Sequence, residues 1–140
     1  RVVPEAKPPA PERFGLVVCG AHMRDLPLNG QLTERGGVFL EATRTTADYR
    51  LYALPGMPAR PGLVRTGSSD GAAIDVELWD LPAEAIGSLL AVVPAPLGFA
   101  PVRLADGRLR HGFVCEAAAV GDALDITHLG GWRAHLAATP

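Results

Sequence analysis

Histidine is the side chain best suited to proton transfer near neutral pH, and one of the four histidines directly follows a turn after an apolar run. The run Phe14–Cys19 is typical of a buried strand, and Gly20 and Ala21 then turn the chain. The N–H groups of a sharp glycine turn can converge on an anion. The order of residues therefore predicts an anion pocket formed by Gly20, Ala21 and Met23, with His22 beside it. The alternative is a loop histidine whose ring is hydrogen-bonded to the backbone.

Arginine supplies the positive charge of this sequence, because Lys7 is its single lysine. A guanidinium group binds carboxylate and phosphate groups through two parallel hydrogen bonds. Arg60 lies in a proline-rich loop that follows Tyr52, and Arg133 lies in the segment DITHLGGWRAH. We expect Tyr52, Arg60 and Arg133 to contribute to substrate binding. The alternatives are an exposed loop arginine without a specific role and a tryptophan segment that only anchors the core.

Several common chemistries are excluded by their missing motifs. The sequence contains no GxSxG, GxxxxGK[ST], HExxH or dinucleotide-binding glycine pattern. Cys19 and Cys115 lie in separate apolar runs without CxxC spacing, which predicts buried free thiols in place of a metal site. We therefore expect neither a metal nor a cofactor.

Charge and hydropathy restrict the partners. The formal net charge is −2 and charged residues make up 20% of the chain, which argues against a nucleic-acid partner. No apolar run approaches the length that spans a membrane, and no secretory signal pattern is present. These features predict a cytoplasmic protein that does not bind membranes.

The chain divides into a linker and one domain. Residues 1–13 carry four prolines and no periodic apolar face, which is typical of an extended linker, and residues 14–140 have the length of one domain. Apolar runs and alternation predict strands near 14–19, 37–46, 49–54, 63–65, 73–79, 99–104 and 109–117. Helical spacing predicts a helix over 82–91, and a last short helix is expected over 131–137. The prolines of 55–62 predict a rigid loop, and the Asp106-Gly107 pair predicts a type I′ turn. The fold class is α+β, with loops gathered at one end of a small barrel.

Several ordered motifs resemble one known family, the C-terminal domain of allophanate hydrolase. They are VVCGAHMRDLPLNGQL, YRLYALPG, RPGL, VELWDLP, VPAPLG and DITHLGGWRAHL, between about Phe14 and Leu136. A more distant resemblance is to the γ-glutamylcyclotransferase-like fold. These resemblances imply a small mixed β-barrel with flanking helices, and a turn after the first strand that forms the floor of an anion pocket. In the family, an upstream amidase domain removes ammonia from allophanate, and the C-terminal domain is implicated in decarboxylating the product, N-carboxycarbamate.

Cyclotransferase chemistry does not fit this sequence. Cyclotransferases resemble one another in a Tyr-Gly-Ser turn and in a carboxylate after the central helix, but this chain has CGAH and AVVPAPLG at those places. Glu77 and Glu84 fit the surface of a strand and of a helix. Without a base in the expected place, the sequence favours decarboxylation over cyclisation.

Decarboxylation of a small dicarboxylate needs a proton donor, and His22 is suited to that role. A bound dianion stabilises the cationic imidazole, which can protonate the nitrogen as the C–N bond breaks. We therefore expect a substrate such as N-carboxycarbamate, a mimic such as malonate, and an amidase domain as partner in cis or in trans. The alternatives are a non-catalytic module that positions or dimerises an amidase, and a domain that only binds small dicarboxylates.

Overall fold

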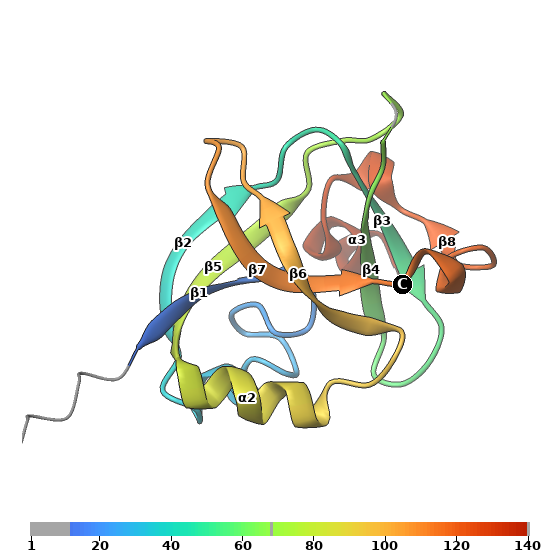
Figure 1. Cartoon of the computed structure of the whole chain (residues 1–140). Helices are drawn as coiled ribbons and strands as arrows, with labels where there is room; N and C mark the ends of the chain where they lie inside the picture. The colour runs from blue at the N-terminus through green and yellow to red at the C-terminus, as the bar shows by residue number, and fades with distance from the viewer. Residues whose placement is uncertain (1–11, 68, 140) are drawn as a thin grey trace, which may run out of the picture.

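A computed structural model describes residues 12–67 and 69–139. Within them the chain forms eight strands, three α-helices and two 3₁₀ turns (Figure 1). The strands are β1 (Arg13–Val18), β2 (Val38–Arg44), β3 (Tyr49–Leu54), β4 (Arg60–Arg65), β5 (Asp75–Pro82), β6 (Leu97–Arg103), β7 (Leu109–Cys115) and β8 (Leu124–Asp125). The helices are α1 (Gly30–Thr33), α2 (Ala83–Val92) and α3 (Trp132–Ala138), and the turns are η1 (Ala117–Ala119) and η2 (Thr127–Leu129).

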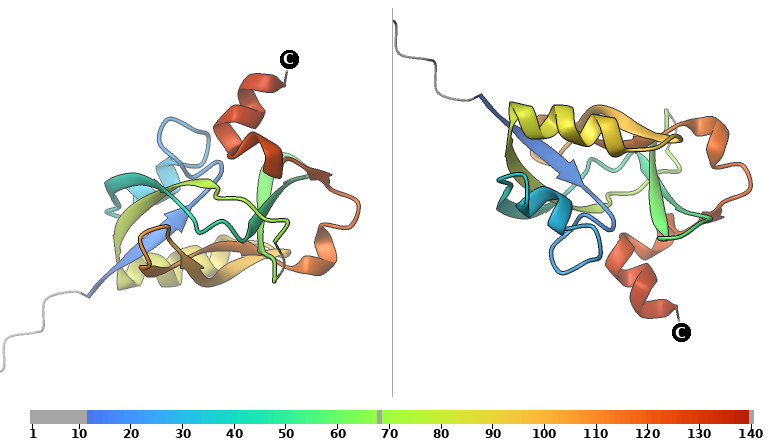
Figure 2. Two further views of the ribbon diagram at one scale, coloured as in Figure 1. Left: turned by 90° about the horizontal axis from the view of Figure 1, so that it is seen from above. Right: turned by 90° about the horizontal axis from the view of Figure 1, so that it is seen from below.

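The strands form two sheets around one core. The larger sheet has the order β2-β5-β1-β7-β6, with β1 antiparallel to β5 and parallel to β7, and the smaller has the order β4-β3-β8. A bridge between Thr45 and Leu104 joins the ends of β2 and β6, so the larger sheet curls into a barrel. The helices α2 and α3 flank this barrel on opposite sides (Figure 2). This is the α+β mixed barrel that the sequence predicted.

Apolar side chains bury both faces of the central strands. Leu16, Val17 and Val18 on β1 are each at most 1% exposed, although their side chains alternate between faces. The neighbouring strand β5 was predicted to have one buried face, and this prediction is wrong, because Glu77 and Trp79 on its other face are buried as well. The loop after β1 and helix α3 cover that second face. Polar side chains on β5 can therefore form buried contacts with these two segments.

The predicted loop over residues 55–62 is wrong at its end. Strand β4 begins at Arg60 and includes Pro61, which pairs with Ala53 on β3. Proline is tolerated because β4 is the edge strand of the smaller sheet. Strand β5 likewise runs further than predicted, to Pro82, which precedes α2 in an extended conformation (ψ 150°).

The hairpin of β6 and β7 closes through a different turn from the one predicted. The Leu104 N–H donates to the Arg108 carbonyl at 2.8 Å, which leaves a three-residue loop. Within that loop Gly107 alone has a positive φ, of 96°. A type I′ turn needs two such residues, so the prediction is wrong, and the loop belongs to the three-residue class with glycine in the left-handed position.

The predicted linker lies almost wholly outside the described residues. The structure does not describe residues 1–11, on which the expectation of an extended linker rests. Strand β1 begins at Arg13, one residue before the predicted boundary, and the Glu12 carbonyl accepts a hydrogen bond from the Ala83 N–H at 2.9 Å. Glu12, the residue directly before β1, is therefore attached to the start of α2.

Candidate functional site

The turn after β1, which leads to His22, lies very close to strand β4. A Cβ atom on Gly20 would lie 2.4 Å from Cδ of Pro61, a distance that side chains do not adopt. Glycine is therefore required here by the close approach of the Pro61 ring to the backbone of the turn. The Met23 N–H donates to the Gly20 carbonyl at 3.0 Å, so this N–H is used within the turn and does not point into a pocket.

Three contacts hold the His22 ring and its backbone in place. Nε2 lies 2.8 Å from Oε1 of Gln31 on α1; because this oxygen accepts, Nε2 carries the hydrogen and Nδ1 is the second, titrating nitrogen. The ring stacks on Phe113 of β7, with centroids 4.6 Å apart and planes 13° apart. The Asn29 side chain donates to the His22 carbonyl at 2.8 Å. The imidazole is thus pre-organised on elements from two parts of the chain.

Burial and nearby arginines keep the imidazole neutral. Burial lowers the pKa of His22 below its ordinary 6.5; the hydrogen bond to Gln31 opposes this shift, and the charges of Arg60 and Arg35 add to it. Arg60 also has a buried Nε with no hydrogen-bond partner among the described residues. A buried donor without a partner is costly. An anion bound here would give Arg60 a partner and stabilise the cationic form of His22.

The cavity beside His22 is small. Its walls are Cys19, Gly20, Ala21, His22, Leu28, Arg60, Pro61, Leu97 and Phe113, and they enclose about 20 Å³. That volume holds about one water molecule. A hollow of about 430 Å³ adjoins it, has four prolines among its eleven lining residues, and shares Arg60 and Leu97 with it. A dicarboxylate is larger than this cavity, so the cavity must widen before one can lie beside His22.

The structure brings some of the predicted residues together and separates others. Gly20, Ala21 and Arg60 lie at the His22 cavity, as the sequence suggested. Met23 faces a different groove, and Arg133 on α3 lines that same groove. Tyr52 pairs with Asp125 of β8 and does not line the cavity. Neither Tyr52 nor Arg133 is placed to contact a ligand beside His22.

Sequence reasoning missed Gln31, Asn29 and Phe113 as neighbours of His22. The two amide residues lie within the motif that starts at the apolar run, seven and nine positions after the histidine. Such a spacing does not predict a contact when the residues lie in a loop, because a loop has no regular repeat. Phe113 comes from a strand that pairs in parallel with β1, and no local pattern in the sequence indicates this pairing.

Sequence reasoning also missed a buried carboxylate, Glu77, which was predicted to lie on a strand surface. It is 2% exposed and accepts four hydrogen bonds. Oε1 accepts from the Arg24 N–H (2.9 Å) and Trp79 Nε1 (3.1 Å), and Oε2 accepts from Arg24 Nε (3.3 Å) and Arg133 Nη2 (3.0 Å). Burial alone would raise the pKa of Glu77, but these donors outweigh it and lower the pKa. Glu77 is therefore a charged group that joins three elements.

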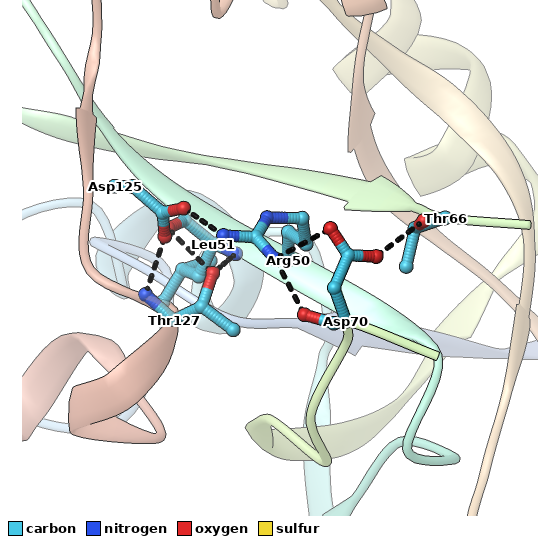
Figure 3. A network of polar contacts seen from close by, with 6 residues as sticks. All are labelled: Arg50, Leu51, Thr66, Asp70, Asp125 and Thr127. Atoms are coloured by element: carbon cyan, nitrogen blue, oxygen red, sulfur yellow. Dashed lines mark hydrogen bonds and ion pairs between the residues drawn. The ribbon is translucent and has the colours of Figure 1, made fainter. Parts of the chain in front are cut away.

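A third polar cluster ties β3 to the C-terminal segment (Figure 3). Arg50 binds Asp125 and Asp70, while Asp125 Oδ1 accepts from the Thr127 N–H at 2.9 Å. Partial burial would raise the pKa of Asp125, but the bonds from Thr127 and Arg50 outweigh it and lower the pKa to about 2. Asp125 thus caps a local turn, and Trp132, 2% exposed, anchors the core. The cluster is structural.

Residues 12–67 and 69–139 contain neither a cluster of metal-binding side chains nor a membrane-spanning helix. No three histidine, cysteine or acidic side chains gather there as a metal site. No helix in the same residues has the length and hydropathy to cross a bilayer. Cys19 and Cys115 are free and buried, which confirms the predicted thiols.

Solved structures place this barrel in a known fold class. It is similar to a mouse aig2-like protein (TM-score 0.60, 15% identity, 79% of this chain and 80% of that chain). It is also similar to a structure described as a γ-glutamyl cyclotransferase (TM-score 0.50, 14% identity, 81% and 70%). At such identities the likeness shows the fold alone, which is γ-glutamylcyclotransferase-like.

Closer similarities define the family. The model of the allophanate hydrolase C-terminal domain matches residues 14–137, and the chain belongs to this family. A urea amidolyase of Saccharomyces cerevisiae is 39% identical over 124 residues, which are 86% of this chain and 7% of that protein. An allophanate hydrolase of Kluyveromyces lactis has a TM-score of 0.87 at 34% identity, over 91% of this chain and 21% of that one. A uropathogenic E. coli-specific protein has a TM-score of 0.84 at 34% identity, over 92% and 99%. The chain thus spans a small part of the first two relatives and nearly the whole length of the third.

Proposed function

We propose that this domain decarboxylates N-carboxycarbamate, the product that an amidase domain, in cis or in trans, releases from allophanate. The observation that carries the proposal is the pairing of His22 with Arg60 at one buried cavity. The imidazole is fixed by Gln31 and Phe113, and the Arg60 Nε donor has no partner among the described residues. Membership in the allophanate hydrolase C-terminal domain family supplies the substrate class.

The chemistry requires one proton and one broken bond. N-carboxycarbamate carries two carboxylates on a single nitrogen, and carbon dioxide leaves when a C–N bond breaks with its electron pair moving to nitrogen. A proton from the imidazolium of His22 then converts that nitrogen to the NH₂ group of carbamate. Arg60 would hold the carboxylate that remains, through its planar pair of donors.

Protonation of His22 follows substrate binding. Without a bound substrate, burial lowers the pKa of His22 below 6.5, which favours the neutral ring at pH 7. A dianion beside the ring favours the charged form and raises this pKa, so that the substrate brings the proton donor into its active state. The cavity of about 20 Å³ must open toward the adjoining hollow to admit the dianion.

The test supplies the domain with allophanate and a separate amidase, and measures carbon dioxide release above the rate with the amidase alone. His22→Asn should lower that rate by about 10²- to 10⁴-fold, the usual contribution of a positioned acid. Arg60→Lys should weaken binding despite keeping the charge, because the ammonium lacks the fork. His111→Asn, at an exposed position on β7, and Arg110→Lys are matched controls that should leave the rate unchanged. Activity should fall as the pH rises through the pKa of His22 in the complex, because only the protonated ring donates.

Malonate provides an independent readout, because it mimics the dianion. Titration of the His22 ring by NMR should show a higher pKa with malonate than without it. A His22→Asn protein with unchanged melting temperature and unchanged rate would remove His22 from the mechanism. That result, together with a His22 pKa that malonate does not move, would favour a non-catalytic module that positions or dimerises an amidase.

A further inference from the structure

A second polar groove lies next to the buried Glu77 and shares no lining residue with the His22 cavity. It encloses about 370 Å³, and its walls include Arg24, Arg44, Arg133 and Asp75. The three arginines come from three different elements, namely the loop after β1, strand β2 and helix α3. Their side chains are between 47% and 66% exposed, so the groove is open to solvent.

Each of these arginines is held in position by other groups. Arg24 lies over the Phe39 ring, 3.8 Å from its centroid, and also donates to Glu77. Arg133 Nη2 donates to Glu77 Oε2 at 3.0 Å and to the Arg24 carbonyl at 2.7 Å. Arg44 Nε donates to Asp75 at 2.8 Å. An arginine fixed in this way loses less conformational entropy on binding a ligand than a freely rotating one.

The groove presents hydrogen-bond donors and an excess of positive charge. Both oxygens of Glu77 already accept two hydrogen bonds each, so this carboxylate has little capacity left to accept a hydrogen bond from a ligand. Both Nη groups of Arg24 and of Arg44, and Nε and Nη1 of Arg133, make no hydrogen bond within residues 12–67 and 69–139. Three guanidinium charges face two carboxylates, Glu77 and Asp75, which leaves a local excess of one positive charge.

We propose that this groove binds a phosphate group. A tetrahedral oxyanion offers acceptors in several directions and can accept from three guanidinium groups on three elements at once, whereas a planar carboxylate suits one or two. The volume also exceeds what the ion itself needs, so either free phosphate or a phosphate monoester fits. The site is independent of the chemistry proposed for His22.

The groove also explains the two glycines of the DITHLGGWRAH segment. The Asp75 N–H donates to the Gly130 carbonyl at 2.8 Å, and a Cβ atom on Gly131 would lie 3.0 Å from Cβ of Asp75. A side chain at Gly131 would press on Asp75, and Gly130 has a positive φ of 80°, so glycine at both positions lets α3 begin directly against β5. This close approach places Arg133 beside Glu77, and the motif that the sequence suggested for the His22 pocket forms the wall of this second groove.

The test is a titration with inorganic phosphate at constant ionic strength, followed through the Nε–Hε NMR signals of the arginines. We expect saturable shifts at Arg24, Arg44 and Arg133. Arg44→Gln removes one donor group without touching the Glu77 contacts, and should weaken binding by about tenfold or more, the usual effect of losing a charge-assisted hydrogen bond. Arg65→Gln is the matched control, because Arg65 is also exposed and also donates to an aspartate at 2.8 Å, but lies outside the groove. It should bind phosphate as the unmodified chain does.

A second titration with glycerol phosphate distinguishes the two sources of the ligand. Tighter binding of this ester than of phosphate identifies an ester as the ligand, and equal binding identifies the free ion. Shifts that grow linearly without saturation, or that chloride reproduces at the same ionic strength, would overturn the proposal. An Arg44→Gln protein that binds phosphate unchanged, or shifts confined to Arg60, would overturn it as well.

Discussion

Replacement of Glu77 by glutamine tests whether one buried carboxylate holds the second face of β5 together. The substitution keeps the size of the side chain and removes its charge. One oxygen remains, and it can still accept from the Arg24 N–H and from Trp79. The other oxygen becomes an NH₂ group that faces Arg24 Nε and Arg133 Nη2, so two charge-assisted bonds are lost.

The expected loss of stability follows from these contacts. Each lost bond would count for about 1.5–3 kcal/mol if fully buried. Both arginine side chains are about half exposed and regain water, which reduces the loss to about 1 kcal/mol each. A buried NH₂ group facing other donors costs roughly 1 kcal/mol more. We therefore expect the free energy of unfolding to fall by about 3 kcal/mol, and the melting temperature by roughly 6–12 °C for a domain of this size.

Equilibrium urea unfolding, followed by far-ultraviolet circular dichroism, measures this change. The control is Asp75→Asn, which breaks an ion pair whose two side chains are 66% and 59% exposed, and should cost less than about 0.5 kcal/mol. A Glu77→Gln protein no less stable than this control would refute the reasoning. The pH gives a second check. Because the pKa of folded Glu77 lies below its ordinary 4.5, its contribution is present above pH 4.5 and is lost as the pH falls below it, so the stability difference should narrow there.

Two further predictions concern the turn beside His22 and the two thiols. Gly20→Ala should destabilise the protein by about 1–3 kcal/mol, because the new Cβ would overlap Pro61. Gly87→Ala in helix α2 should stabilise it by about 0.5–1 kcal/mol, because a Cβ there would meet nothing within 4 Å. Thermal melting of both variants measures the two changes, and equal changes in melting temperature would contradict the prediction. Burial raises the pKa of Cys19 to about 12, so a disulfide reagent at pH 8 should react slowly with this thiol in the folded protein. After unfolding, both Cys19 and Cys115 should react, and a denatured protein without free thiols would contradict the reduced state.

Local patterns in the sequence were sufficient for most elements of the fold. Alternation over residues 49–54 coincides with β3, and the short helix expected over 131–137 matches α3 to within one residue. The alternating burial at the start of β3 is a short repeat, so a window of ten residues contains this signal. The position of His22 after β1 was predictable for the same reason, because a buried run followed by glycine marks where a strand ends.

Contacts between distant segments were not predictable in this way. Glu77 was placed on a surface because alternation along β5 indicates which face a residue occupies, but not whether another element covers that face. The cover comes from Arg24 and Arg133, which are 53 and 56 residues away. Pro61 shows the same limit, since its place within a strand depends on β4 being an edge strand, which is a property of the whole sheet.

The loop after β1 connects the two sites and gives them opposite electrostatics. Within three residues it presents His22, which burial and neighbouring arginines keep neutral, and Arg24, whose charge Glu77 and the Phe39 ring stabilise. The Arg24 carbonyl also accepts from Arg133, so this loop is fastened to α3 on one side while Asn29 fastens the His22 carbonyl on the other. A loop held at both ends keeps its middle residues at fixed positions, as a proton donor requires. The Glu77 contacts therefore stabilise the backbone that positions His22, although none of them touches the ring.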